Sequence, residues 1–236
     1  GRATLGMTNI GGYSALPAQP KKRPAWMVGG LTILSFVALL YVIEAYDSVT
    51  GHRLDSNGIR PLETDGLTGI LFAPLLHSNW EHLVANTGPA LVLGFLMTLA
   101  GLSRFLFATA IIWIIGGVGV WLTSPDNSIT LGASGVIFGW LAFLLARGIV
   151  TRRARDLGLG LLVLVLYGGL LLGVLPGTPG VSWQGHLGGL VGGAVVAALL
   201  IWAPRQQRAV VQYAGAAVLF VLIVAAIALR ALTLAP

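Results

Sequence analysis

The serine at position 134 is the first candidate for chemistry, because it stands between small residues in Gly132-Ala133-Ser134-Gly135. A polar loop over residues 124–128 precedes it and an apolar stretch, residues 136–146, follows it. We therefore expect the hydroxyl at the N-terminus of a helix. Small residues beside a serine are also typical of closely packed membrane helices. The motif alone fits a packing contact as well as a nucleophile.

A second polar cluster contains His82 and Asn86, which are spaced i, i+4 and share one face of a helix. His77 lies five residues before His82 and need not share that face. Hydrogen bonds between helices would be the simpler role for such side chains. His77 and His82 lack the i, i+4 spacing of a helical histidine pair and a third ligand. We therefore expect no metal site and no cofactor.

The third cluster is His186 with the glycines that follow it. His186, Gly189 and Gly193 stand at i, i+3 and i+7, so they form one stripe of a helix. By itself the stripe fits a helix-packing surface. It would hold His186 on the face that approaches a neighbouring helix most closely.

The composition requires a lipid environment for these elements. The 236 residues are 56% hydrophobic and 9% charged, against roughly 25% charged in soluble domains. Mean hydropathy is +0.87. The net charge of +6 is spread over short turns, which excludes a basic nucleic-acid-binding face. Absence of cysteine excludes disulfides, thiolate catalysis and cysteine metal sites.

Apolar runs of the length needed to cross a bilayer predict an all-α polytopic membrane protein. A flexible cytoplasmic tail, residues 1–24, comes first, and a long polar stretch, residues 47–67, follows the first span. The seven expected spans cover residues 26–45, 81–100, 103–122, 134–150, 157–175, 185–202 and 209–232.

The distribution of Lys and Arg predicts the orientation. With the N-terminus in the cytoplasm, only Arg53, Arg60 and Arg230 of the 14 basic residues lie outside. The other 11 lie inside: Arg2, Lys21, Lys22, Arg23, Arg104, Arg147, Arg152, Arg153, Arg155, Arg205 and Arg208. This orientation places Ser134, His186, His82 and Asn86 at similar depth, near the outer face.

Because Ser134 and His186 lie at similar depth, they could meet, and a serine beside a histidine is the minimal activated nucleophile. His186 would accept the proton of Ser134, and His82, Asn86 and the Ser134 N–H would stabilise the oxyanion. No acidic residue lies within the later spans away from their ends, so a Ser-His dyad is expected and an ion-coupled transporter is disfavoured. Phe138 would pack against the imidazole. The helices that begin near Ser134 and His186 would be able to pack closely at four glycines, Gly135, Gly139, Gly189 and Gly193.

These motifs resemble the rhomboid family of intramembrane serine proteases. His82-x-x-x-Asn86, Gly132-Ala133-Ser134-Gly135 and Gly185-His186-Leu187-Gly188-Gly189 occur in the family's order and on its second, fourth and sixth helices. The resemblance implies a six-helix protease core, residues 25–203, in which Ser134 is the nucleophile and His186 the general base. His82 and Asn86 would line the oxyanion hole.

The resemblance also implies transmembrane protein substrates, a bacterial plasma-membrane location, a membrane-embedded first loop and a lateral gate at the fifth helix. It leaves the oligomeric state open. The Trp-Arg pair often seen in the family's first loop is absent, and Phe138 stands where some members have tyrosine. Residues 204–236 would add a cytoplasmic turn and a seventh transmembrane helix. The alternative is a catalytically inactive relative that binds membrane helices.

Overall fold

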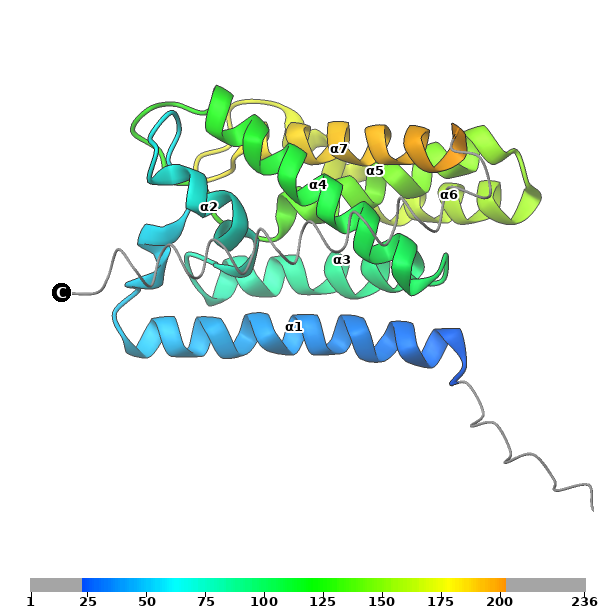
Figure 1. The fold of residues 1–236 in the computed structure, drawn as a ribbon, viewed down its shortest axis with the longest axis horizontal. Coiled ribbons are helices and arrows are strands. Elements are labelled where there is room, and N and C mark those ends of the chain that lie inside the picture. The colour runs from blue at the N-terminus through cyan, green and yellow to red at the C-terminus, as the bar shows by residue number, and fades with distance from the viewer. Residues whose placement is uncertain (1–22, 203–236) are drawn as a thin grey trace, which may run out of the picture.

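Helices make up most of residues 23–202, the part of the chain that the computed structural model describes (Figure 1). Within that range the only β pairing is an isolated bridge between Ile59 and Thr130. The tail before residue 23 and the seventh span expected at 209–232 lie outside the described residues. The elements are α1 (Ala25–Val49), η1 (Leu54–Asn57), α2 (Gly66–Phe72), η2 (Ala73–Leu75), α3 (Trp80–Thr98), α4 (Leu102–Thr123), α5 (Ser134–Thr151), α6 (Ala154–Tyr167), η3 (Gly168–Val174) and α7 (Trp183–Trp202).

Five helical segments of the described chain are long and apolar enough to cross a membrane, namely α1, α4, α5, α6 with η3, and α7. The expected second span forms as α3 but is not among these five. Its first half carries Glu81, His82 and Asn86, which lower its hydropathy. The polytopic helical fold predicted from the sequence is therefore confirmed, with α3 as its most polar member.

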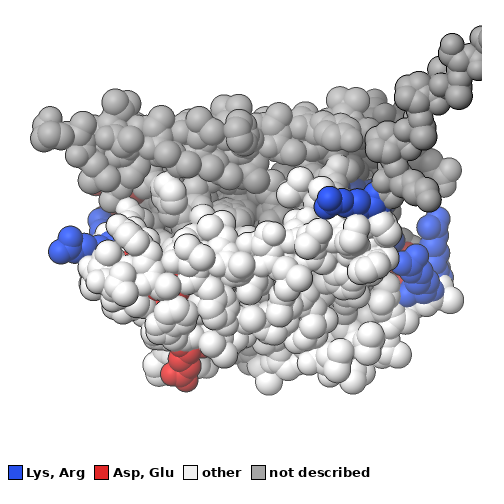
Figure 2. Space-filling view, turned by 90° about the horizontal axis from the view of Figure 1, so that it is seen from below, with Lys and Arg blue, Asp and Glu red and all other residues white. Residues whose placement is uncertain are grey.

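Successive long helices run in opposite directions, so α3, α5 and α7 are parallel to one another and antiparallel to α1, α4 and α6 (Figure 1). The starts of α3, α5 and α7 lie at the same end of the molecule as the end of α1 and the short helix α2. The α3–α4 and α5–α6 turns, with Arg104, Arg152 and Arg153, lie at the other end. In Figure 2 most Lys and Arg side chains lie toward the two ends, and the described surface between them has few charged side chains.

Glycines allow α5 and α7 to pack backbone against backbone, as the glycine stripe predicts. A Cβ added at Gly189 would collide with the carbonyl oxygen of Gly135, and one at Gly193 with that of Gly139. On the other side of α7, a Cβ at Gly188 would come 3.1 Å from Cα of Gly116 in α4. The starts of α5 and α7 are thus closer together than any residue larger than glycine would permit at these positions.

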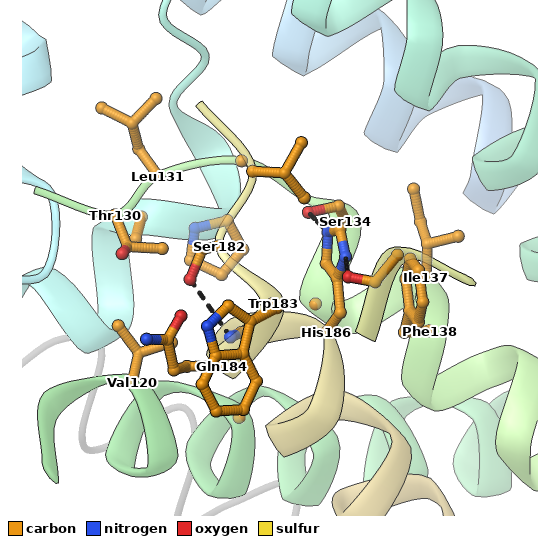
Figure 3. Close-up of a pocket in the computed structure, with 18 of the residues that line it drawn as sticks. Val120, Thr130, Leu131, Ser134, Ile137, Phe138, Ser182, Trp183, Gln184 and His186 are labelled. Carbon is orange, nitrogen blue, oxygen red and sulfur yellow. Dashed lines mark hydrogen bonds between the residues drawn. The ribbon is translucent and has the colours of Figure 1, made fainter. Parts of the chain in front are cut away.

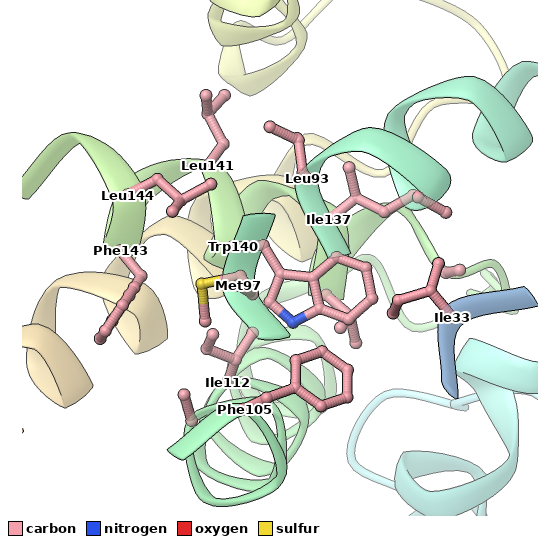
Figure 4. Packing of buried hydrophobic residues seen from close by; sticks show 14 of the residues in the cluster. Ile33, Leu93, Met97, Phe105, Ile112, Ile137, Trp140, Leu141, Phe143 and Leu144 are labelled. Carbon is pink, nitrogen blue, oxygen red and sulfur yellow. The ribbon is translucent and has the colours of Figure 1, made fainter. Parts of the chain in front are cut away.

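Trp140 of α5 occupies the centre of the main apolar cluster and is 1% exposed (Figure 4). Its ring lies 5.6 Å from that of Phe105 and 6.4 Å from that of Phe36, measured between centroids. The indole Nε1 donates a 2.9 Å hydrogen bond to Thr109 Oγ1, so its one polar atom is satisfied. This cluster fixes α5 against α1 and α4.

Two tryptophans of α4 anchor the loop between α1 and α3. Trp113 Nε1 donates to the carbonyl oxygen of Ile70 at 2.8 Å, and Trp121 Nε1 donates to that of Glu63 at 2.9 Å. The loop also contacts the segment that leads into Ser134. Ile59 and Thr130 exchange two backbone hydrogen bonds, and Gly132 N donates to the Ala73 carbonyl at 2.8 Å.

Candidate active site

Ser134 is the first residue of α5, and His186 lies in the first turn of α7. The close packing of these two helices brings the side chains together, and Ser134 Oγ lies 2.9 Å from His186 Nε2 (Figure 3). This distance is within hydrogen-bond range for a nucleophile and its general base.

The imidazole of His186 is fixed on two sides. Its Nδ1 lies 2.9 Å from the carbonyl oxygen of Gly173. Because a carbonyl only accepts hydrogen bonds, Nδ1 carries the hydrogen and Nε2 is left free to accept from the serine. The ring of Phe138 stacks on the imidazole with 4.0 Å between centroids and 9° between planes. The packing expected for Phe138 is therefore confirmed.

The sequence offered no sign that Gly173 would orient the histidine, since a backbone carbonyl can come from any residue type. Gly173 lies in η3, the 3₁₀ segment that follows α6 and begins with the Gly168-Gly169 pair. A Cβ at position 173 would come 3.0 Å from His186 Nδ1 and 3.1 Å from Phe138 Cζ. Only glycine brings its carbonyl this close without displacing a ring.

His82 and Asn86 lie on α3 beside the loop that leads into α5. The His82 ring lies against Gly132, where a Cβ would come 2.8 Å from His82 Nε2, and Gly132 has a φ of +118°. His82 Nδ1 lies 3.3 Å from Ser78 Oγ. Asn86 Nδ2 donates to the His82 carbonyl oxygen at 2.9 Å, which uses one of its two amide hydrogens.

His77 is the residue of this site that its spacing did not reveal. It is 1% exposed, and its ring packs edge-on against His82 with 5.0 Å between centroids. Burial, and after it the neighbouring His82, lowers the pKa of His77 to about 3, so the ring is neutral at pH 7. Its Nε2 accepts a 3.4 Å hydrogen bond from the N–H of Ala133, the residue before Ser134.

A single cavity of about 910 Å³ brings the predicted site residues together. Ser134, His186, His82 and Asn86 all line it, although they come from three helices. Ser182, Trp183 and Gln184, at the start of α7, form another part of its wall (Figure 3). A cavity of this size can hold several residues of an extended peptide beside the serine.

Comparison with known proteins agrees with this geometry. Residues 64–203 match the rhomboid domain model. The uncharacterized protein Rv1337 of Mycobacterium tuberculosis is 60% identical over 206 residues, which cover 84% of this chain and 85% of that protein. Rhomboid protease GluP of Bacillus subtilis is 33% identical over 134 residues, 55% of this chain and 25% of that protein. No solved structure matches the chain.

The chain therefore belongs to the rhomboid family, a family of polytopic helical membrane proteins that are in general intramembrane proteases. The uncharacterized protein ML1171 of Mycobacterium leprae is 53% identical over 225 residues, which cover 87% of this chain and 89% of that protein. The resemblance stated from the three sequence motifs is confirmed at the level of the family.

Proposed function

We propose that this protein is an intramembrane serine endopeptidase that cleaves transmembrane segments with a Ser134–His186 dyad. The observation that carries the proposal is the 2.9 Å contact between Ser134 Oγ and His186 Nε2, with Nδ1 of the same ring bonded to a carbonyl. A histidine held in this tautomer can only act as an acceptor toward the serine. The Gly173 carbonyl takes the orienting role that an aspartate has in a triad.

In the proposed reaction His186 Nε2 takes the proton of Ser134 while Oγ attacks the peptide carbonyl carbon. The resulting imidazolium is stabilised by the Gly173 carbonyl on Nδ1 and by the face of Phe138. His186 then gives the proton to the leaving amine and the peptide C–N bond breaks. Water, activated by the same Nε2, hydrolyses the acyl-enzyme and releases the second product.

The oxyanion would be stabilised by the backbone N–H of Ser134 and by side chains of α3. The N–H of Ser134, at the first position of α5, has no acceptor within its helix. Asn86 retains one amide hydrogen after its bond to the His82 carbonyl. His82 lies beside Gly132 and faces the same cavity. Together they form a set of donors suited to a developing negative charge.

The proposed substrate is a transmembrane helix that reaches the cavity from the lipid. Of the candidate spans in the described chain, α6 with η3 has the smallest buried share, 11%. Beyond Arg155 in its first turn, its large exposed side chains are apolar, including Leu161, Val165 and Leu172. This weakly packed span lies next to Gly173 and the site, which favours it as the side of entry.

The direct test is cleavage of a fluorogenic transmembrane peptide by the purified protein in liposomes. We expect Ser134→Ala and His186→Ala each to lower turnover by at least about a thousandfold. Ser56→Ala is the matched control, because the hydroxyl of this exposed serine donates to the Arg53 carbonyl, away from the cavity, and its loss should leave turnover at the wild-type level.

Labelling with a serine-reactive fluorophosphonate separates the protease from the inactive relative. Wild type and Ser56→Ala should be labelled, and Ser134→Ala should not. A wild-type protein that binds the peptide but is neither labelled nor active would favour the helix-binding alternative. Wild-type turnover in either dyad variant would refute the assignment.

A further inference from the structure

A cluster of ionisable side chains lies where α1 ends and the first loop begins, apart from the proposed dyad. Asp47 belongs to the last turn of α1, His52 to the turn after it and Asp55 to η1. One ligand atom from each residue lies within 4.8 Å of the other two. His52 Nδ1 is 3.8 Å from Asp47 Oδ2 and 3.8 Å from Asp55 Oδ2.

Two carboxylate oxygens of this cluster are buried without a hydrogen-bond partner. Asp47 is 1% exposed; its Oδ1 accepts the N–H of Leu54 at 2.7 Å, while its Oδ2 has no partner. Asp55 Oδ1 is also buried and also has no hydrogen-bond partner. At 3.8 Å the His52 ring is too far away to serve as a donor. A buried carboxylate oxygen left unpaired is costly unless a cation compensates it.

A neighbouring acidic side chain adds to the uncompensated negative charge of this cluster. Glu44, one turn before Asp47, is 1% exposed, so a second buried carboxyl group lies at this end of α1 beside the partly exposed Asp55. The cluster thus has an excess of negative charge that a single histidine cannot balance.

The backbone holds His52 over the two carboxylates in an uncommon conformation. Gly51 and His52 have φ values of +77° and +55°, and the N–H of His52 donates to the Asp47 carbonyl at 2.8 Å. A left-handed conformation is uncommon for residues other than glycine. The turn directs the ring back to Asp47, and the side chain remains 45% exposed, so the open side of the cluster faces solvent.

We propose that Asp47, His52 and Asp55 bind a divalent transition-metal ion, with Zn²⁺ as the best match. One imidazole nitrogen with two carboxylate oxygens suits zinc, whereas calcium and magnesium take oxygen ligands alone. Ligand atoms on a tetrahedral zinc ion are about 3.3 Å apart, so modest side-chain movements would complete the site. Water from the exposed side would fill the fourth position.

The ion would clamp the first loop at its origin. It would link η1 to the last turn of α1, a few residues before Ile59, which pairs with Thr130 in the segment leading to Ser134. The expectation of no metal site considered His77 and His82 only. This cluster instead depends on a turn and a 3₁₀ helix that no regular ligand spacing predicts.

Zn²⁺ binding to the purified full-length protein tests the proposal. After treatment with EDTA and dialysis against ZnCl₂, we expect one zinc ion per chain by mass spectrometry and a thermal midpoint higher by roughly 5 °C. Because the protein has no cysteine, thiolates cannot supply a competing site. The Ser134→Ala variant should bind zinc equally well, which keeps this result separate from the proposed protease activity.

The variants His52→Asn and Asp55→Asn should each abolish both the stoichiometric zinc and the thermal shift. Asparagine tolerates the left-handed backbone at position 52, so that variant keeps the turn. Asp65→Asn, in the same loop but exposed and outside the cluster, should bind zinc like wild type. Zinc retained by the two cluster variants, no zinc in wild type, or a thermal shift with Ca²⁺ but not Zn²⁺ would each overturn the proposal.

Discussion

At the scale of single residues, the ring of Phe138 holds the plane of the His186 imidazole. The rings are stacked at 4.0 Å, and such contacts contribute about 0.5–1.5 kcal/mol beyond area burial. We expect Phe138→Leu to lower kcat by about 2- to 12-fold in the liposome assay. Phe138→Tyr keeps the ring and should stay near the wild-type rate. Equal rates for all three proteins would show that the stacking has no role in turnover.

His77 acts through its neutral ring on the residue before the serine. Its pKa of about 3 lies below the ordinary value of 6.5, so between these pH values the unfolded chain binds a proton there and the folded protein does not. Stability should therefore fall as the pH is lowered from about 6.5 towards 3. In His77→Gln the amide oxygen can still accept the Ala133 N–H, but this titration is absent.

We expect the free energy of unfolding of His77→Gln to decline less steeply over that pH range than that of wild type. The free energies of unfolding of the two proteins can be measured in mild detergent at a series of pH values. At pH 8 both side chains are neutral, so the difference measured there gives the part that does not depend on protonation. Parallel pH curves for the two proteins would contradict the neutral, buried state of His77.

At the scale of helices, the α5–α7 contact positions the dyad. Gly189→Ala places a methyl group into the Gly135 carbonyl, and overpacking of this kind costs about 1–3 kcal/mol. We expect a lower unfolding midpoint together with reduced cleavage, because the helix starts separate and the Ser134–His186 contact lengthens.

Gly158→Ala is the matched control for this helix contact. Nothing lies within 4 Å of a Cβ added at this exposed position of α6. Alanine there should leave stability unchanged or raise it by about 0.4–1 kcal/mol. Equal stability of the two alanine variants would mean that the helices have room to separate without cost.

At the scale of the whole molecule, the charge distribution predicts which end faces outward. The chain contains no cysteine, so single cysteines can be introduced without background. With the N-terminus in the cytoplasm, Asp126→Cys, in the loop before Ser134, should react with a membrane-impermeant maleimide on intact cells. Arg153→Cys, at the α5–α6 turn, should react only after permeabilisation. The reverse pattern would place the proposed active site at the cytoplasmic face.

The sequence by itself determined the family and the six long helices of the described residues, with boundaries within a few residues except that the fifth expected span, residues 157–175, forms as α6 followed by η3. Apolar runs predict spans because lipid requires every backbone group to be satisfied within a helix. The sequence also singled out Ser134, His186, His82 and Asn86 as candidate site residues, since polar side chains are unusual in apolar helices. The i, i+4 spacing further placed His82 and Asn86 on one helix face.

Only the tertiary structure decided how these residues meet and what supports them. The Gly173 carbonyl, the His77 contact with Ala133 and the Trp113 and Trp121 anchors are contacts between segments distant in the chain. Such contacts have no periodicity in the sequence, because a backbone carbonyl or an indole N–H finds its partner through packing. The serine motif supplied the candidate nucleophile, and the close packing of α5 on α7 placed His186 beside it.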